Sequence, residues 1–144
     1  MNESMFHLNL KIYLTFLKMN KFTSPISYAV ITDFTADGLP LAHLRPCLLV
    51  IGSNSCLHCR NLIPEIYKLI DPLIKLNIKI IIAQPFDGAT AAERALVNIM
   101  PLLLGSKTIN LPTLVFVNTL GMKYITEGFI TKDALLSNLL NMTL

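Results

Sequence analysis

The chain has 144 residues, which is the size of one domain with a single hydrophobic core. Only 15% of the residues are charged, yet charge, proline or glycine interrupts every apolar run before the roughly 20 residues that a membrane-spanning helix needs, so no transmembrane segment is predicted. The net charge of +3 comes from scattered lysines and arginines, a pattern that does not indicate a nucleic-acid partner.

The N-terminal stretch has the apolar spacing of an amphipathic helix over residues 5–19. We therefore expect an N-terminal helical extension, residues 1–25, ahead of the main domain, residues 26–144. The apolar run between Lys11 and Lys18 is shorter than the core of a secretory signal, and no small-residue cleavage site follows it. This favours a cytoplasmic location, with export as the alternative if the N-terminus is trimmed.

Short runs rich in β-branched and aromatic residues predict the strands. The predicted strands are residues 27–34, 47–51, 78–83, 113–118 and 122–126. The run at 47–51 is apolar throughout, as expected where helices cover both faces of a sheet. The turn at 119–121 joins the last two strands into a hairpin.

Helices are predicted between these strands from apolar spacing and capping residues. One runs from Leu57 to about Ile74, and Pro64 inside it predicts a kink. A second begins at the capping box from Thr90 to Glu93 and ends before Pro101. A third follows Thr131 as N-cap, with four leucines directed inward: Leu135, Leu136, Leu139 and Leu140. This order predicts an α/β three-layer sandwich, with a mixed central sheet and helices on both faces.

Two cysteines, Cys56 and Cys59, stand between the strand at 47–51 and the helix that follows. The first thiol therefore lies at a helix N-terminus, where unpaired backbone N–H groups and the helix dipole favour an anion. Such a placement, with His58 adjacent, lowers a cysteine pKa from about 8.5 toward roughly 3.5 to 7.5, which makes the thiol nucleophilic. The pattern predicts disulfide exchange, with Cys56, Cys59 and His58 as the catalytic residues.

Zinc binding is the other interpretation of the same pair. A structural zinc site needs about four ligands, and the nearby candidates are Cys47, His43 and His58. No second C-x-x-C is present, so we expect no metal and no cofactor. Cys47 lies on a predicted buried strand, where a free cysteine usually serves packing.

Several residues in register resemble the thioredoxin superfamily. Cys56 and Cys59 match the redox pair of that family, and Pro64 lies where thioredoxins carry their helix-kinking proline. The segment 111–113, Leu-Pro-Thr, resembles the cis-proline loop, and Gly128 stands at the family's spacing beyond it.

The resemblance covers residues 26–142 and implies a thioredoxin-like fold and a mechanism. Cys56 would exchange with a substrate thiol or disulfide through a mixed disulfide, which Cys59 would resolve. Leu111 and Pro112, with a cis peptide bond between them, would hold an extended substrate segment beside the first thiol. Pro64 and Gly128 would be structural.

The departures from thioredoxins concern the redox direction. The residue before the first cysteine is Ser55 rather than tryptophan, and Val50 occupies the position of the buried aspartate that assists proton transfer. The Leu57-His58 pair resembles DsbA-type thiol oxidases in its histidine, which stabilises the reduced thiolate form. These residues favour oxidation or exchange over general reduction.

The function predicted is therefore thiol–disulfide oxidoreductase, acting on protein or small-molecule thiols and disulfides with an unidentified redox partner. The alternative is a thioredoxin-like binding or assembly module, in which an apolar groove and the N-terminal helix hold a partner and the cysteines act as a redox switch. An oligomer or a complex with a protein partner could form through the apolar surface. A third, weaker hypothesis is a metal-handling domain on the same fold.

Overall fold

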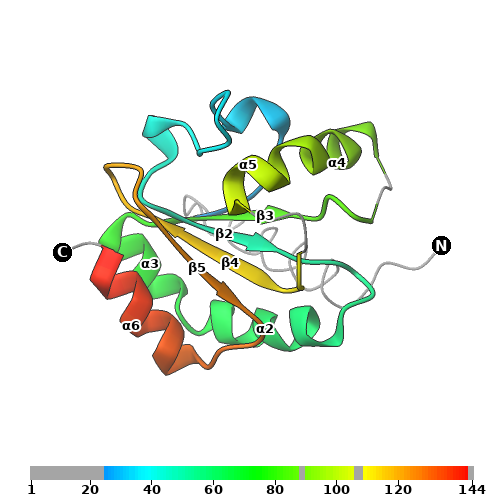
Figure 1. Cartoon of the computed structure of the whole chain (residues 1–144). Coiled ribbons are helices and arrows are strands. Elements are labelled where there is room, and N and C mark those ends of the chain that lie inside the picture. The colour runs from blue at the N-terminus through cyan, green and yellow to red at the C-terminus, as the bar shows by residue number, and fades with distance from the viewer. Residues whose placement is uncertain (1–24, 88–89, 106–108, 143–144) are drawn as a thin grey trace, which may run out of the picture.

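The computed structural model describes residues 25–87, 90–105 and 109–142. The helix predicted at residues 5–19 lies outside the described residues. The described chain is built around a mixed sheet of five strands in the order β1-β3-β2-β4-β5 (Figure 1). The strands are β1 (Ile26–Tyr28), β2 (Cys47–Ile51), β3 (Lys79–Ala83), β4 (Thr113–Val117) and β5 (Lys123–Glu127). β1, β3 and β2 are parallel, whereas β4 and β5 are antiparallel to their neighbours.

Helices cover both faces of this sheet, as the sequence predicted (Figure 1). One face carries α2 (Leu57–Tyr67), α3 (Ile70–Leu76) and α6 (Lys132–Met142). The other carries α4 (Ala91–Leu96) and α5 (Met100–Leu104), linked by the 3-10 turn η3 (Val97–Ile99). Two further 3-10 turns, η1 (Ile31–Asp33) and η2 (Ala42–Leu44), connect β1 to β2.

The side chains of β2 alternate between two hydrophobic clusters. Leu48 and Val50 pack toward α2 and α6, whereas Cys47, Leu49 and Ile51 pack toward α4 and α5. All five are fully buried. A continuous apolar strand is needed here because both faces of the sheet are covered.

The single long helix predicted after the cysteines is two helices. The chain stays helical through Pro64 and leaves the helix at Lys68 and Leu69 before α3 begins. The reason is Pro72, which has no N–H to continue the ladder and therefore lies in the first turn of α3, where none is required.

Two other predicted boundaries were wrong for local reasons. β1 ends at Tyr28 because the Asp33 carboxylate accepts a hydrogen bond from the Val30 N–H at 2.9 Å and closes a 3-10 turn. Helical structure continues past Pro101, because that proline occupies the first turn of α5.

The remaining local predictions are largely confirmed. Thr90 caps α4 by accepting from the Glu93 N–H, and the Thr131 hydroxyl accepts from the Ala134 N–H at the start of α6. Leu135 and Leu139 are buried, but Leu140 is 44% exposed, so its predicted inward direction was wrong.

Truncation of Leu62 tests the packing of α2 on the sheet. Leu62 is fully buried, so Leu62→Ala is expected to lower the free energy of unfolding by about 2 to 5 kcal/mol through lost burial and a residual cavity. Urea denaturation measures this change. The matched control is Leu120→Ala, 82% exposed in the hairpin turn, which should change stability by less than about 0.5 kcal/mol. Equal effects at the two positions would contradict the assigned packing.

Candidate redox site

Cys56 is the N-cap residue of α2. Its Sγ atom accepts a hydrogen bond from the Cys59 N–H at 3.2 Å, so one of the unpaired donors at the helix start points at this sulfur. The side chain is half-buried, and the cysteine is a free thiol. This geometry places the first sulfur at the N-terminus of α2, as the sequence predicted.

Cys59, one turn into α2, is fully buried. Burial, and next the hydrogen bond with the Cys56 side chain, raise the pKa of the Cys59 thiol to about 12, while a hydrogen bond from the Ser53 backbone opposes this. Cys47 is also buried, in the cluster on the other face of the sheet, and burial raises its pKa to about 12. The two thiols of the pair thus differ in access, and Cys47 is a core side chain.

The loop before β4 meets the first thiol. The Leu111–Pro112 peptide bond is cis, and the Cys56 thiol donates to the Leu111 carbonyl at 3.6 Å. The Gly128 N–H donates to the Pro112 carbonyl at 2.8 Å, which ties this loop to the end of β5. Gly128 has a φ of +88° with open space around it, so backbone conformation rather than crowding favours glycine there. The structure therefore brings together Cys56, Leu111, Pro112 and Gly128.

His58 is placed differently. It lies on the exposed first turn of α2 beside the exposed Leu57, and within the described residues no hydrogen bond joins its ring to either sulfur. Its predicted catalytic role is therefore not supported by a contact in this structure. Pro64 lies farther along α2, inside the helix.

A polar cluster that the sequence did not predict holds the loop in front of the cysteines. The Asp87 carboxylate, from the segment after β3, accepts hydrogen bonds from the Ser53 hydroxyl at 2.6 Å and from the Asn54 N–H at 3.1 Å. The Ser53 carbonyl in turn accepts from the Cys56 N–H. The negative charge of Asp87 also contributes to raising the pKa of Cys59.

Asp87 thus supplies a carboxylate near the pair although the family position, Val50, is apolar and fully buried. Its distance of 31 residues from Cys56 in the chain left no local pattern by which it could have been predicted. The signal that was present is the polar run 52–55 itself, whose buried hydroxyl at Ser53 needs a partner.

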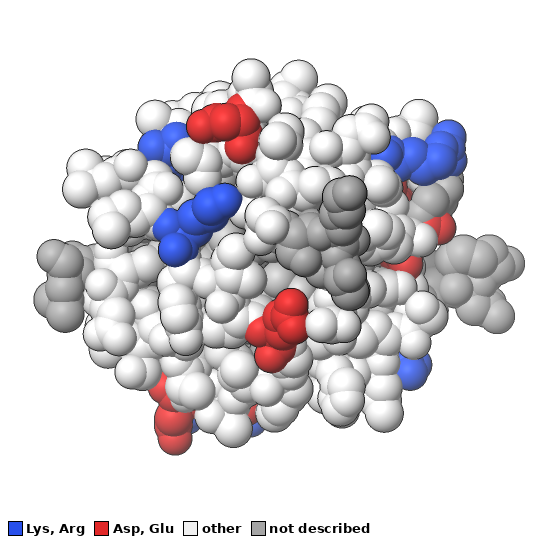
Figure 2. All heavy atoms as spheres, in the orientation of Figure 1, with Lys and Arg blue, Asp and Glu red and all other residues white. Residues whose placement is uncertain are grey.

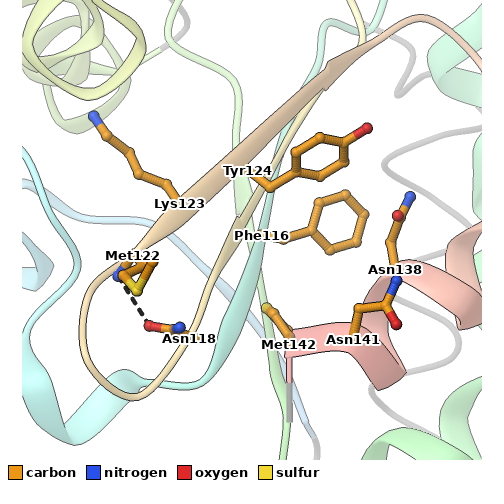
Figure 3. A pocket seen from close by; sticks show the side chains of 8 residues that line it. All are labelled: Phe116, Asn118, Met122, Lys123, Tyr124, Asn138, Asn141 and Met142. Atoms are coloured by element: carbon orange, nitrogen blue, oxygen red, sulfur yellow. Dashed lines mark hydrogen bonds between the residues drawn. The ribbon is translucent and has the colours of Figure 1, made fainter. Parts of the chain in front are cut away.

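One pocket in the described part of the molecule lies away from the thiols. It has a volume of about 430 Å³ and lies between the β4–β5 hairpin and α6 (Figure 3). Phe116, Tyr124 and Met142 form its apolar part, and Asn118, Asn138 and Asn141 line it with amides. The pocket lies toward the hairpin-turn end of β4, whereas Leu111 precedes the other end of that strand. It is therefore separate from the thiol site, which is formed by Cys56, Cys59 and the loop at Leu111 and Pro112.

Among the helices of the described residues, none combines the length and the apolar composition that a membrane span requires. Likewise, within residues 25–87, 90–105 and 109–142, no three or more histidine, cysteine or acidic side chains are grouped so as to hold a metal ion.

Comparison with known proteins identifies the class of fold. No protein-family model and no curated protein sequence matches the chain. Among solved structures, thioredoxin O2 from Arabidopsis thaliana in its oxidised state matches with a TM-score of 0.57 and 15% identity, over 84% of this chain and 96% of its own. Chloroplastic thioredoxin z matches with a TM-score of 0.54 and 16% identity, over 70% of this chain and 82% of its own. The chain therefore has a thioredoxin-like fold, which confirms the fold that the resemblance implied.

The unequal thiols give a pH prediction. A pKa of about 12 keeps Cys59 protonated at neutral pH, with a thiolate fraction about a thousandfold below that of an ordinary cysteine. In the reduced protein, iodoacetamide should therefore label Cys56 well before Cys59 or Cys47, as peptide mass spectrometry would show. In Cys56→Ser, burial, the largest cause of the raised Cys59 pKa, is kept, so labelling of Cys59 should still rise steeply with pH from pH ~7 to ~10, by about tenfold per pH unit while the thiol stays mostly protonated.

Asp87→Asn is the informative variant for this experiment. An asparagine Oδ1 atom can still accept from Ser53 and Asn54, but the negative charge is gone, so Cys59 should label about two- to threefold faster at a given pH. The matched control is Asp71→Asn on α3, an exposed carboxylate that does not act on Cys59. A plateau in the Cys59 profile below pH ~10 would contradict the assigned burial.

Proposed function

We propose that this protein is a thiol–disulfide oxidoreductase that exchanges disulfides through Cys56 and Cys59. One observation carries the proposal: the Cys56 sulfur lies at the N-terminus of α2 and within 3.6 Å of the Leu111 carbonyl, which precedes the cis-proline. This arrangement combines a nucleophilic sulfur with a backbone edge beside it.

The proposed reaction has two exchange steps. The Cys56 thiolate attacks one sulfur of a substrate disulfide, forming a mixed disulfide and releasing the other substrate sulfur as a thiolate, which takes up a proton. Cys59 loses its proton and attacks the Cys56 sulfur, forming the Cys56–Cys59 disulfide and releasing the second substrate thiol. The substrate gains two electrons and the protein loses two. The reverse sequence oxidises a substrate dithiol, and a second thiol or disulfide compound restores the starting state.

The second step requires Cys59 to become nucleophilic only once the mixed disulfide has formed. Burial keeps its thiol protonated in the resting reduced protein. Its side chain is within hydrogen-bonding reach of Cys56, so the resolving attack needs little movement. Asp87 accepts a hydrogen bond from Ser53 and so acts as the positioning residue for the loop before the cysteines. The Ser53 backbone in this loop contacts both Cys56 and Cys59.

Substrate is proposed to bind as an extended segment at the cis-proline loop. Leu111 is half-buried and offers backbone groups next to the Cys56 sulfur. Leu57 and Phe86 are 59% and 46% exposed on neighbouring segments, which favours thiol substrates with apolar flanks. The substrates in this proposal are therefore protein or small-molecule thiols and disulfides.

The proposed direction is oxidation or exchange rather than general reduction. Val50 removes the family's buried aspartate, and the Leu57-His58 pair is similar to DsbA-type oxidases in its histidine. An exposed His58 without a hydrogen bond to either sulfur acts on the thiol pair at most through its charge, so its contribution is expected to fall as salt is added.

A second candidate, a binding module with a redox switch, is favoured by the exposed apolar side chains of Leu57, which follows Cys56, and Phe86, which precedes Asp87. In this reading the cysteines change oxidation state without turnover. The two candidates differ in one measurable property, which is catalysis of exchange.

Turnover is expected for the enzyme. The wild-type chain should accelerate insulin reduction by dithiothreitol or oxidation of a reduced peptide, and Cys56→Ser should abolish the acceleration because the attacking sulfur is lost. Cys59→Ser should instead accumulate a mixed disulfide with the substrate, visible as a mass adduct that dithiothreitol removes. Rates equal to buffer for wild type, with a reversible Cys56–Cys59 disulfide, would support the switch and exclude the enzyme.

Equilibration with glutathione buffers tests the direction. The reduction potential of the pair should lie on the oxidising side of about −230 mV, beyond the range of thioredoxin near about −270 mV. His58→Ala should move it toward more negative values, because loss of the imidazole destabilises the reduced thiolate form. A wild-type potential at or below that of thioredoxin would make the protein a reductant, and the oxidising assignment would be wrong.

A further inference from the structure

The outer edge of β5 carries a free row of backbone hydrogen-bonding groups. β5 is the last strand of the sheet and pairs with β4 alone among the described strands. The Met122 carbonyl accepts from the Asn118 N–H at 3.0 Å, and the Gly128 N–H donates to the Pro112 carbonyl at 2.8 Å. The backbone N–H and carbonyl groups of the even-numbered residues in this strand therefore point toward β4.

Because pairing alternates along an antiparallel strand, the odd-numbered residues of β5 face the other way. These are Lys123, Ile125 and Glu127. In the part of the chain that the structure describes, no hydrogen bond to their backbone N–H or carbonyl groups is present. β5 thus offers three residues whose main-chain groups can pair with another strand.

The sequence of this edge is complementary to itself. If a second copy of β5 runs antiparallel about Ile125, Lys123 lies opposite Glu127 of the other copy, and Ile125 lies opposite Ile125. Each of these pairs joins residues whose backbone groups face outward, so the ladder of hydrogen bonds and the side-chain pairs share one register. The paired strands would therefore contain two Lys123–Glu127 pairs of opposite charge, one at each end.

The two charged side chains are already held on the face of the sheet that carries Ile125. The Lys123 ammonium donates to the Leu103 carbonyl, and Glu127 accepts from the Asn110 amide at 2.8 Å. In Figure 3, Lys123 and Tyr124 point to opposite sides of the hairpin. Both charges therefore lie on one face of the strand, and a partner's opposite charge would share or replace these intrachain contacts.

The surface around β5 is also suited to burial. Met122, Tyr124 and Ile125 are 67%, 57% and 36% exposed, and Leu120 projects from the turn beside them. Figure 2 shows the face over the β4–β5 hairpin with few, separated charged side chains. An exposed strand edge with apolar side chains and no proline is the kind of edge that pairs with another strand.

We propose that β5 is a dimerisation strand, through which two copies of this chain pair antiparallel about Ile125 and join their sheets into one continuous sheet. The two-fold axis passes through Ile125, as a symmetric interface requires. The strand contact is short, so the dimer should be weak and concentration-dependent.

This arrangement places the two thiol sites at opposite ends of the shared strand pair. Thr113, which follows Pro112, pairs with Glu127, so the thiol site lies at the Glu127 end of β5. An antiparallel partner places its own Glu127 at the opposite end of the shared strand pair. The proposal does not depend on the redox chemistry and can be tested without any activity assay.

The test is to reverse the charges that pair across the two-fold axis. The molar mass of the full chain is measured by sedimentation over a series of protein concentrations. Wild type should pass from monomer to dimer. Lys123→Glu and Glu127→Lys should each weaken the dimer by about tenfold, because each creates two like-charge pairs. The double variant Lys123→Glu with Glu127→Lys restores opposite charges and should return to within about threefold of wild type.

The double variant separates pairing from damage to the fold. It loses both intrachain contacts, to Leu103 and to Asn110, so a purely structural effect would make it worse than either single variant. Lys75→Glu on the exposed side of α3 changes the net charge as Lys123→Glu does and should dimerise like wild type.

Ile125→Pro gives a second, independent readout. Its lost N–H faces outward, so pairing with β4 is kept while pairing with a partner strand is broken, and this variant should be monomeric with an unchanged far-ultraviolet spectrum. A wild-type chain that stays monomeric at every concentration would overturn the proposal. So would a dimer that survives Ile125→Pro, or a double variant no better than the singles.

Discussion

The antiparallel pairing of β2 with β4 determines where the chemistry lies. Ile51, the last residue of β2, pairs with Thr113, the first residue of β4. The chain leaving β2 reaches Cys56, and the chain entering β4 has just passed Pro112. The pairing therefore brings the thiol loop, residues 52–56, and the cis-proline loop to one end of the sheet. In the chain, 55 residues separate Cys56 from Leu111. Without this register the sulfur would face no backbone edge.

Burial then makes two cysteines of one motif chemically different. Cys56 caps α2 at its half-exposed end, whereas Cys59 points into the cluster that also buries Val50 and Leu62. Desolvation favours the neutral thiol, so the pKa of Cys59 is raised, while the Cys56 sulfur accepts a hydrogen bond at the helix start. Asp87 strengthens this asymmetry from another segment of the chain, by holding Ser53 and by adding negative charge near Cys59.

Features that depend on neighbouring residues could be predicted from the sequence, whereas features that depend on residues distant in the chain could not. β2 was predicted with its observed bounds, and Thr90 was placed correctly as a cap, because both follow from neighbouring residues. The predicted boundaries that were wrong lie next to prolines and polar side chains, which act over only a few residues. Pro72 divides the helix after the cysteines, and Asp33 ends the first strand by offering its backbone a competing hydrogen bond.

By itself, the sequence determined the C-x-x-C at a helix start, the apolar strands and the overall α/β order, since these arise from local residue patterns and their spacing. The tertiary structure alone decided that the Cys56 sulfur contacts the Leu111 carbonyl, that Asp87 supports the thiol loop, and that His58 stays exposed without bonding to either sulfur among the described residues. It also decided which backbone groups of β5 face outward. These features join segments distant in the chain or depend on strand register, and no local pattern of residues specifies either.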